Sequence, residues 1–369
     1  MRVVVIGAGV LGASAAFHAA LAGADTALVD RADPGRATAA GAGIICPWSS
    51  GHIGEHRCRL ADAGARYYPR LLALSDEHSA GETGYARVGV LAVSAERTEL
   101  DHTERVLLAR REQSPEVGDV TRLTPDEARQ LFPPLARDLA AVRVGGGARV
   151  DGRLLTAALR TAAERCGARV IDGAAELLTE GSHVAGVRVG AGCLAADRVI
   201  VAAGAWAPAL LAPLGITLAV QPQRGQITHL RLQGSDTRAW PVVLPPTSHY
   251  MLAFDNGWIV VGATRENGVG FDCRVTAAGQ AEILNQALAV APGLADATLI
   301  ETRVGLRPVG PGLRPMLGRV DGLDGLVIGN GMGPSGLTIG PYAGGLLAQL
   351  ARDQQPDLDL APYDPLRRP

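Results

Sequence analysis

The sequence predicts an α/β protein in which a Rossmann-type dinucleotide-binding domain is interrupted by a discontinuous α+β substrate-binding domain with an antiparallel sheet. Three observations predict this class. A strand, a glycine-rich turn and a helix open the chain, two further glycine-rich turns follow buried strands, and strand-forming segments cluster between residues 217 and 263. Because 369 residues exceed what one core usually organises, we expect two domains. The first is expected to comprise 1–80, 145–215 and 303–369, and the second 81–144 and 216–302.

The opening segment carries the spacing G-x-G-x-x-G. Four β-branched residues at 3–6 predict a buried strand, and the apolar run after the turn predicts a helix. Gly7 permits the tight turn, Gly9 lets a pyrophosphate approach the backbone, and Gly12 lets the helix pack closely on the strand. A second predicted strand ends at Asp30, whose carboxylate is suited to ribose hydroxyl groups. This context makes the glycine motif a strong indication of dinucleotide binding.

The same segment resembles, in outline, a secretory signal or membrane anchor, because Arg2 precedes an apolar region. Glycines and His18 interrupt that region, and it leads directly into a second strand rather than into a cleavage site. A membrane span requires uninterrupted apolar length. The dinucleotide interpretation is therefore favoured.

Composition excludes several function classes. The net charge is −2 with charges well mixed, so nucleic acid is not expected as a partner. Five scattered cysteines without a C-x-x-C pair favour a reducing, cytoplasmic setting and no metal site. The chain contains no lysine, so it cannot form a pyridoxal phosphate Schiff base or supply a Walker lysine. There is also no G-x-S-x-G elbow of a serine hydrolase.

Apolar spacing predicts the remaining elements. The small residues at 37–43 predict either a backbone that passes close to a flat ligand or a flexible loop, with Trp48 and His52 as rim candidates. Helices are predicted at 57–78, 96–112, from 124, at 153–166, 277–291 and 338–352. Strands are predicted at 85–94, 168–172, 184–189, 197–204, 226–232, 250–254, 258–262 and 325–329.

Two later segments resemble cofactor turns. Asp197 to Trp206 is a buried strand that ends at Gly204, where the backbone must run close to a neighbour. A core strand and turn is the plain alternative, but the N-terminal motif favours cofactor contact. The turn at 330–336 feeds a helix whose free N–H groups attract an electron-rich group.

The order of these motifs resembles the flavoprotein D-amino-acid oxidase superfamily, in its glycine oxidase and D-amino-acid dehydrogenase-like branch. The resemblance covers nearly the whole chain. Its most specific part is Gly305-Leu-Arg-Pro308, followed by Arg314-Pro-Met-Leu-Gly318 and the terminal turn. The other matching motifs are Gly7–Gly12, Ala39–Ile44, Val201–Trp206, Arg224–Gln226 and Val261–Thr264 with Glu266.

The resemblance implies FAD rather than NAD, and hydride transfer from Cα to flavin N5 that leaves an imine for hydrolysis. The cofactor carries the chemistry, so no side-chain base is obligatory. In chain order, the residues expected to contact the cofactor are Gly7, Gly9, Val10, Leu11, Gly12, Asp30, Arg31, Ala40, Gly41, Gly43, Ile44, Ala203, Gly204, Trp206, Arg307, Gly331, Gly333, Ser335, Gly336, Leu337 and Thr338.

The resemblance also implies that Arg307 binds the substrate carboxylate, with Tyr250 closing on the same group. A guanidinium suits this task because it is a planar fork of donors that stays charged. From residue types alone, Arg307 would be a salt-bridged surface arginine and Tyr250 a core aromatic residue. The motif order favours substrate binding for Arg307, and it leaves the substrate-binding and core interpretations of Tyr250 equally supported. His249 and His52 are candidates for proton handling, although an isolated histidine is more often structural.

The chain departs from the family pattern at several positions. Met332 and Pro334 replace residues that related oxidases use in the wall of the substrate site, which puts glycine itself in doubt. The sarcosine oxidase branch attaches flavin through a cysteine near the arginine, but no cysteine lies between 274 and 369. FAD is therefore expected to be non-covalent. That branch also uses a lysine over the flavin for the reaction with oxygen, and this chain contains no lysine. The electron acceptor, oxygen or another compound, therefore stays open.

The leading expectation is an FAD enzyme that oxidises the C–N bond of an amino acid or N-substituted amino acid. A second hypothesis keeps FAD but takes a 2-hydroxy acid, because carboxylate recognition does not specify the neighbouring heteroatom. A third is a non-catalytic dinucleotide-binding sensor. The sequence leaves substrate, stereochemistry and a homo-oligomeric state open.

Overall fold

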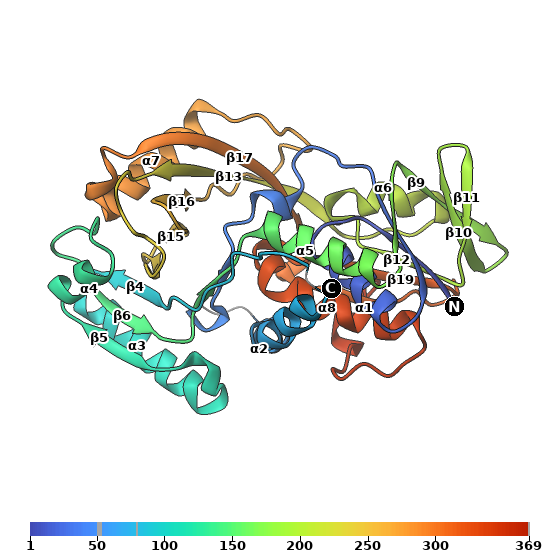
Figure 1. The fold of residues 1–369 in the computed structure, drawn as a ribbon, viewed down its shortest axis with the longest axis horizontal. Coiled ribbons are helices and arrows are strands. Elements are labelled where there is room, and N and C mark those ends of the chain that lie inside the picture. Colours follow the sequence, from blue (N-terminus) through green and yellow to red (C-terminus); the bar gives the residue numbers. More distant parts are fainter. Residues whose placement is uncertain (50–53, 79, 368–369) are drawn as a thin grey trace.

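A six-stranded sheet and an eight-stranded sheet lie one after the other along the long axis of the molecule. The N-terminus lies at the end formed by the six-stranded sheet (Figure 1). The structure is a computed structural model, and it describes residues 1–49, 54–78 and 80–367. The fold is α/β, with a mixed, mainly parallel sheet and a largely antiparallel second sheet, as predicted.

The first sheet has six strands, which are β1 (Arg2–Ile6), β2 (Asp25–Asp30), β8 (Arg169–Asp172), β12 (Arg198–Val201), β18 (Met316–Arg319) and β19 (Leu326–Asn330). Their order is β18-β19-β12-β1-β2-β8, and only β18 runs antiparallel to its neighbour. The central strand β1 is apolar on both faces because both faces are covered. Val3 and Val5 enter one core, and Val4 and Ile6 enter another.

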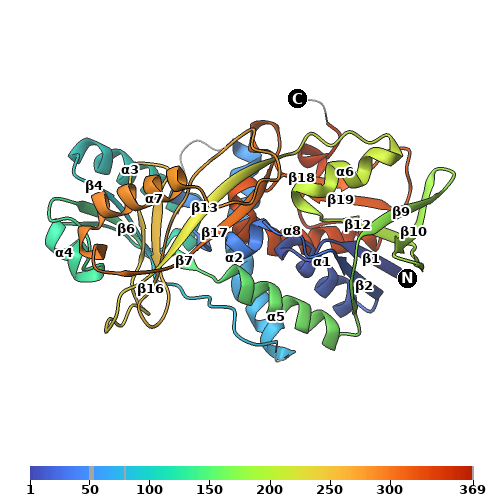
Figure 2. The ribbon, with the colours of Figure 1, turned by 90° about the horizontal axis from the view of Figure 1, so that it is seen from above.

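Helices cover one face of this sheet, and a small antiparallel sheet covers the other. The helices are α1 (Val10–Leu21), α2 (Glu55–Glu77), α5 (Gly152–Arg165) and α8 (Gly336–Ala351). Helix α1 packs against α5 and α8, and α2 packs against α8 (Figure 2). The opposite face carries α6 (Ala207–Leu211) and the strands β9 (Ala175–Glu180), β10 (His183–Val189) and β11 (Gly192–Ala195).

The second sheet has eight strands from two stretches of the chain. They are β4 (Val90–Ser94), β5 (Val120–Leu123), β6 (Ala140–Val144), β13 (Gln221–Arg231), β14 (Val242–Leu244), β15 (Tyr250–Ala253), β16 (Trp258–Gly262) and β17 (Thr298–Val309). The order is β17-β13-β16-β15-β14-β4-β6-β5, with one parallel pair, β14 with β4. Three helices accompany the sheet: α3 (Arg97–Gln113), α4 (Pro125–Leu131) and α7 (Ala277–Val290). The two-residue strands β3 (Ile44–Ile45) and β7 (Ala148–Arg149) pair between the two sheets.

Most predicted elements are present within one or two residues of their expected bounds. Helix α4 begins with a capping box between Thr124 and Glu127, and α5 is capped by the Asp151 carboxylate. The strand predicted at 85–94 begins only at Val90, because Gly89 has a φ of +80° that interrupts an extended run. The domain division stays a prediction; its expected boundary at residue 303 falls inside the single strand β17.

Candidate functional site

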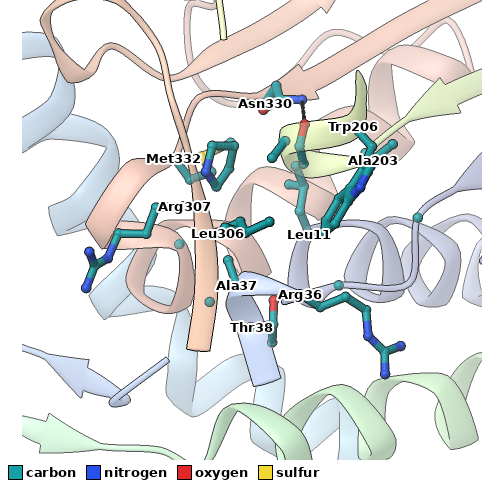
Figure 3. Close-up of a pocket in the computed structure, with 18 of the residues that line it drawn as sticks. Leu11, Arg36, Ala37, Thr38, Ala203, Trp206, Leu306, Arg307, Asn330 and Met332 are labelled. Atoms are coloured by element: carbon teal, nitrogen blue, oxygen red, sulfur yellow. Dashed lines mark hydrogen bonds between the residues drawn. The ribbon is translucent and has the colours of Figure 1, made fainter. Parts of the chain in front are cut away.

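A cavity of about 570 Å³ opens at the carboxyl ends of the parallel strands and extends to the second sheet. The three glycine-rich turns predicted from the sequence all contribute to its wall, together with β17 and the start of β15. Crevices beyond the carboxyl ends of parallel strands are the usual ligand positions in open α/β sheets. Figure 3 shows Arg307 and Arg36 at opposite sides of the cavity, with Leu306, Ala37 and Leu11 between them.

The N-terminal turn has the geometry of a phosphate cradle. Gly7 has a φ of +102°, and a Cβ at this position would lie 2.5 Å from the Ala202 carbonyl oxygen. A Cβ at Gly12 would lie 1.8 Å from the Gly7 carbonyl oxygen, so only glycine permits this close packing of α1 on the strand. Gly9 lines the cavity directly beside the start of α1. The turn therefore presents bare backbone and a helix N-terminus to the ligand space.

Asp30, the last residue of β2, lies beside this turn. Its carboxylate accepts hydrogen bonds from the backbone N–H of Ala8 at 2.5 Å and of Ala32 at 2.6 Å, and lies 3.5 Å from the Arg36 guanidinium. A carboxylate has four lone-pair directions, so Asp30 retains acceptor capacity for a ligand hydroxyl group. The two backbone bonds fix its orientation toward the cavity that it lines.

The small residues at 37–43 form a wall of the cavity rather than a surface loop. Residues Ala37–Ala40 are a short 3-10 helix, and the Thr38 hydroxyl accepts a hydrogen bond from the Val10 N–H at 3.1 Å. A Cβ at Gly43 would lie 1.7 Å from the Val150 carbonyl oxygen, and one at Gly41 would lie 2.7 Å from Leu337. Of the two sequence-based alternatives, the close approach of backbone to ligand space is the one observed.

The middle and terminal turns meet at Asn330. Its side-chain amide donates to the Gly204 carbonyl oxygen at 2.9 Å (dashed in Figure 3), and its side-chain oxygen accepts from the Gly331 N–H at 2.8 Å. Asn330 is buried and thereby ties the end of β12 to the loop that leads into α8. Gly336, Leu337 and Thr338, at the start of α8, line the cavity. The N-terminus of a helix presents backbone N–H groups that can face an electron-rich ligand group.

Arg307 and Tyr250 meet at the end of the cavity formed by the second sheet. The Arg307 Nη1 donates to the Thr264 carbonyl oxygen at 3.0 Å and to Gln223 at 3.4 Å. Burial lowers the pKa of Arg307, and the nearby Tyr250 hydroxyl opposes this effect. Burial likewise raises the pKa of Tyr250, against the field of Arg307. A guanidinium and a phenol hydroxyl are both hydrogen-bond donors suited to one carboxylate.

The structure brings nearly all predicted site residues to this cavity. Those that line it are Gly7, Gly9, Val10, Leu11, Asp30, Arg31, Ala40, Gly41, Gly43, Ile44, Ala203, Gly204, Trp206, Tyr250, Arg307, Gly333, Gly336, Leu337 and Thr338. Gly12 and Gly331 lie behind the lining, and the Ser335 hydroxyl accepts a hydrogen bond from Arg57.

Two expectations need correction. His249 does not line the cavity; it lies just before β15, and its imidazole lies 3.3 Å from Glu282 on α7. Trp48 is buried and donates to Asp62 of α2 at 2.8 Å, so it does not form a rim. His52 lies outside the described residues.

Several lining residues have no counterpart in the sequence analysis. Arg36 precedes the small-residue segment and Thr38 lies within it, and their polar side chains are a usable signal there. Arg265 follows the matched Val261–Thr264 motif and lines the cavity near Arg307. The stretch 173–177 at β9 gave no signal, because it reaches the cavity only through the packing of the small antiparallel sheet.

Other kinds of site are not found in the described part of the chain. Among residues 1–49, 54–78 and 80–367, no group of three or more His, Cys, Asp or Glu side chains could hold a metal ion. Within the same residues, no helix has the length and apolar character needed to cross a membrane. The cavity wall, as far as it is described, contains no cysteine or histidine.

Comparison with known proteins matches the chain to the family described as FAD dependent oxidoreductase (DAO) over residues 2–350. The chain is 50% identical to the uncharacterized oxidoreductase YurR of Bacillus subtilis over 98% of both chains. It is 32% identical to the glycine oxidase of Pseudomonas aeruginosa, over 100% of this chain and 99% of the relative.

Solved structures agree with this assignment. The iminodiacetate oxidase from Chelativorans sp. BNC1 superposes with a TM-score of 0.96 at 49% identity, over 99% of each chain. The glycine oxidase from Geobacillus kaustophilus superposes with a TM-score of 0.88 at 27% identity, over 100% of this chain and 99% of that one. The glycine cradle, Asp30 and the helix N-termini fit the FAD that the family name implies. The chain belongs to the DAO family of FAD-dependent oxidoreductases.

Proposed function

We propose that this protein binds FAD non-covalently and oxidises the C–N bond of an N-substituted amino acid, with N-carboxymethyl amines of the iminodiacetate type as the preferred class. The carrying observation is the Arg307 and Tyr250 pair at one end of the cavity. In the described part of the chain, Arg307 forms no ion pair with a carboxylate. A guanidinium held by neutral acceptors alone is suited to an anionic ligand.

The proposed cofactor arrangement uses the whole cavity. The glycine turn at 7–12 and the start of α1 would hold the pyrophosphate, and Asp30 would accept ribose hydroxyl groups. The N-terminus of α8 would face the polar edge of the ring system. The absence of cysteine and histidine from the described cavity wall supports non-covalent binding.

The role of the protein side chains is to bind and orient the substrate. Arg307 and Tyr250 would each donate to the carboxylate next to the carbon that is oxidised, which fixes that carbon in one position. Bound FAD supplies the two-electron acceptor. The amine loses a hydride equivalent and a proton, and water then cleaves the carbon–nitrogen double bond into a 2-oxo acid and an amine.

The chain is 49% identical to the iminodiacetate oxidase but only 32% and 27% identical to the two glycine oxidases. This difference supports an N-carboxymethyl amine, rather than glycine, as the substrate. Anaerobic addition of iminodiacetate, sarcosine, glycine and 2-hydroxyglutarate to the holoenzyme tests the proposal. Bleaching of the flavin by iminodiacetate or sarcosine is expected, with glyoxylate as the product and glycine or methylamine, respectively, as the released amine. Bleaching by 2-hydroxyglutarate alone would replace the proposal with hydroxy-acid oxidation, and bleaching by none would favour a sensor.

A further inference from the structure

Arg224 and Glu266, which belong to two of the family motifs, form an ion pair next to the cavity. Arg224 is 5% exposed, and its Nε and Nη2 donate to the Glu266 carboxylate at 3.1 and 2.6 Å. Their backbones also pair, since the N–H of each residue donates to the carbonyl oxygen of the other at 2.9 Å. Hydrogen bonds between charged groups are short and strong. The segment that carries Glu266 is therefore held firmly against β13.

The ion pair lies behind the cavity wall. Along β13 and along the segment after β16, successive residues alternate between lining the cavity and lying behind it, as expected for extended chain. Those that line the cavity are Gly225, Ala263 and Arg265, and those behind it are Arg224, Gln226, Thr264 and Glu266. The Arg307 guanidinium lies on the cavity side, against Gly225. Arg307 and the ion pair are thus on opposite sides of the same wall.

Thr264 connects the two sides of this wall. Its carbonyl oxygen accepts a hydrogen bond from Arg307 Nη1 at 3.0 Å, whereas its hydroxyl donates to Glu266 Oε1 at 2.7 Å. The same hydroxyl accepts from the Gln226 N–H at 3.0 Å, and the Gln226 amide donates to Glu266 Oε1 at 2.8 Å. Thr264 and Gln226 are almost fully buried. A buried polar network whose members are all bonded is rigid, so Glu266 fixes the carbonyl group that Arg307 binds.

The network holds Arg307 without neutralising it. Arg224 also donates to Asp272 at 2.8 Å, and Asp272 accepts from Arg274 at 3.0 Å. With Glu266, these side chains comprise two cations and two anions, so the network carries no net charge. Although partial burial disfavours the ionised form, the hydrogen bonds that Glu266 accepts, foremost those from Arg224, lower its pKa. The Glu266 carboxylate is thus committed to Arg224, and the charge of Arg307 stays available to an anionic ligand.

We propose that Glu266 is a positioning residue for substrate binding, which fixes the Thr264 carbonyl oxygen and thereby aims the Arg307 guanidinium at the substrate carboxylate. Arg224 is the anchor of this arrangement. The inference rests on the proposed function, in which Arg307 binds that carboxylate. Glu266 does not line the cavity, so it acts on the ligand only through Arg307.

Binding of an unreactive ether to the holoenzyme provides the test. Diglycolate matches iminodiacetate with oxygen in place of nitrogen, and its binding is read from the perturbation of the flavin spectrum, so no turnover is required. Glu266→Gln removes the charge that Arg224 holds. Thr264→Val removes the hydroxyl that links the two sides of the wall, whereas Thr264→Ser keeps it. Glu301→Gln, at a glutamate of the same sheet that pairs with Arg303, is the matched control.

Glu266→Gln and Thr264→Val are each expected to raise the dissociation constant of diglycolate by about fivefold or more, because Arg307 is no longer held in one direction. Thr264→Ser should bind diglycolate more tightly than Thr264→Val, and Glu301→Gln should bind it like the wild type. In a protein that already carries Arg307→Ala, Glu266→Gln should have no further effect, since the two residues act in one chain of contacts. The affinity for FAD should stay at the wild-type value in Glu266→Gln.

Two results would overturn the positioning role. One is wild-type diglycolate binding in Glu266→Gln, and the other is an equal effect of Glu266→Gln with and without Arg307. Wild-type diglycolate binding in Arg307→Ala alone would instead refute the role that the proposed function gives to Arg307, and the positioning role with it. A wild-type flavin that no amine reduces would refute the proposed reaction, while the ether titrations would still test the positioning role.

Discussion

Gly225 lies against the guanidinium group of Arg307. A Cβ built on Gly225 would stand 2.5 Å from Arg307 Cζ and 2.5 Å from its Nη2. The two residues belong to adjacent strands, β13 and β17, where Gly225 pairs with Gly305 and Gln223 pairs with Arg307. The absence of a side chain at Gly225 therefore makes the space that the guanidinium occupies.

Gly225→Ala is expected to displace the Arg307 guanidinium, which is the flexible end of a long side chain, rather than to disrupt the sheet. The Michaelis constant for iminodiacetate should rise by about tenfold or more, because the charged contact to the carboxylate is lost. The melting temperature and FAD content should stay near the wild-type values. Steady-state kinetics with thermal unfolding provides the check, and a wild-type Michaelis constant in this variant would contradict the described relationship.

Asp30→Ala is expected to weaken FAD binding. The substitution removes the proposed acceptor of ribose hydroxyl groups and leaves the Ala8 and Ala32 N–H groups without their carboxylate partner. A loss of about 1–3 kcal/mol would raise the FAD dissociation constant by about fivefold to 150-fold. Titration of apoprotein with FAD, followed by flavin fluorescence, measures this constant. Asp25→Asn, at the exposed start of the same strand, is the control and should bind FAD like the wild type.

FAD is expected to leave the protein when it unfolds. In the described cavity wall no cysteine or histidine is available to form a covalent bond to the ring. Acid precipitation should therefore give a white pellet and a yellow supernatant that contains intact FAD. A yellow pellet after washing would show a covalent link and would contradict this prediction.

Stability should fall as the pH decreases from about 6.5 to 4. Burial lowers the pKa of His229 from 6.5 to about 4, and its Nδ1 accepts a hydrogen bond from Trp258 at 2.8 Å. Between these values the unfolded chain takes up a proton that the folded protein refuses, so the free energy of unfolding decreases with falling pH. The full difference corresponds to about 3 kcal/mol.

The same prediction can be assigned to one residue. His229→Gln keeps an acceptor for Trp258 and removes the titration, so the dependence on pH should become shallower. Burial lowers the pKa of His18 as well, which accounts for a remaining slope. Urea unfolding at several pH values measures the effect, with exposed His102→Gln as the control. Equal slopes in His229→Gln and the wild type would contradict the assignment.

The parts of the site that the sequence predicts well are those in which the backbone needs glycine. Gly7, Gly12 and Gly43 occupy positions where a Cβ would collide with a carbonyl oxygen, so their spacing carries the geometry directly. Asp30 was predictable for a similar reason, since its place at the end of a parallel strand fixes its position beside the turn.

The parts that the sequence did not predict depend on contacts between distant elements. Arg57 reaches Ser335, 278 residues away in the chain, only because α2 packs against α8. His249 is a sequence-based candidate for proton handling, but in the fold its imidazole lies beside Glu282 of α7 and outside the cavity lining. Only an assembled fold distinguishes these cases.

The central claim is that Arg307 holds the carboxylate of a carboxymethyl amine that reduces the bound flavin. Anaerobic stopped-flow reduction by iminodiacetate, compared between the wild type and Arg307→Ala, tests it most directly. The proposal predicts rapid bleaching in the wild type. In the variant, which still contains FAD, the binding free energy of iminodiacetate should be weakened by about 2–5 kcal/mol, which raises the apparent dissociation constant by about 30-fold or more. The same dissociation constant and reduction rate in both proteins would contradict the claim.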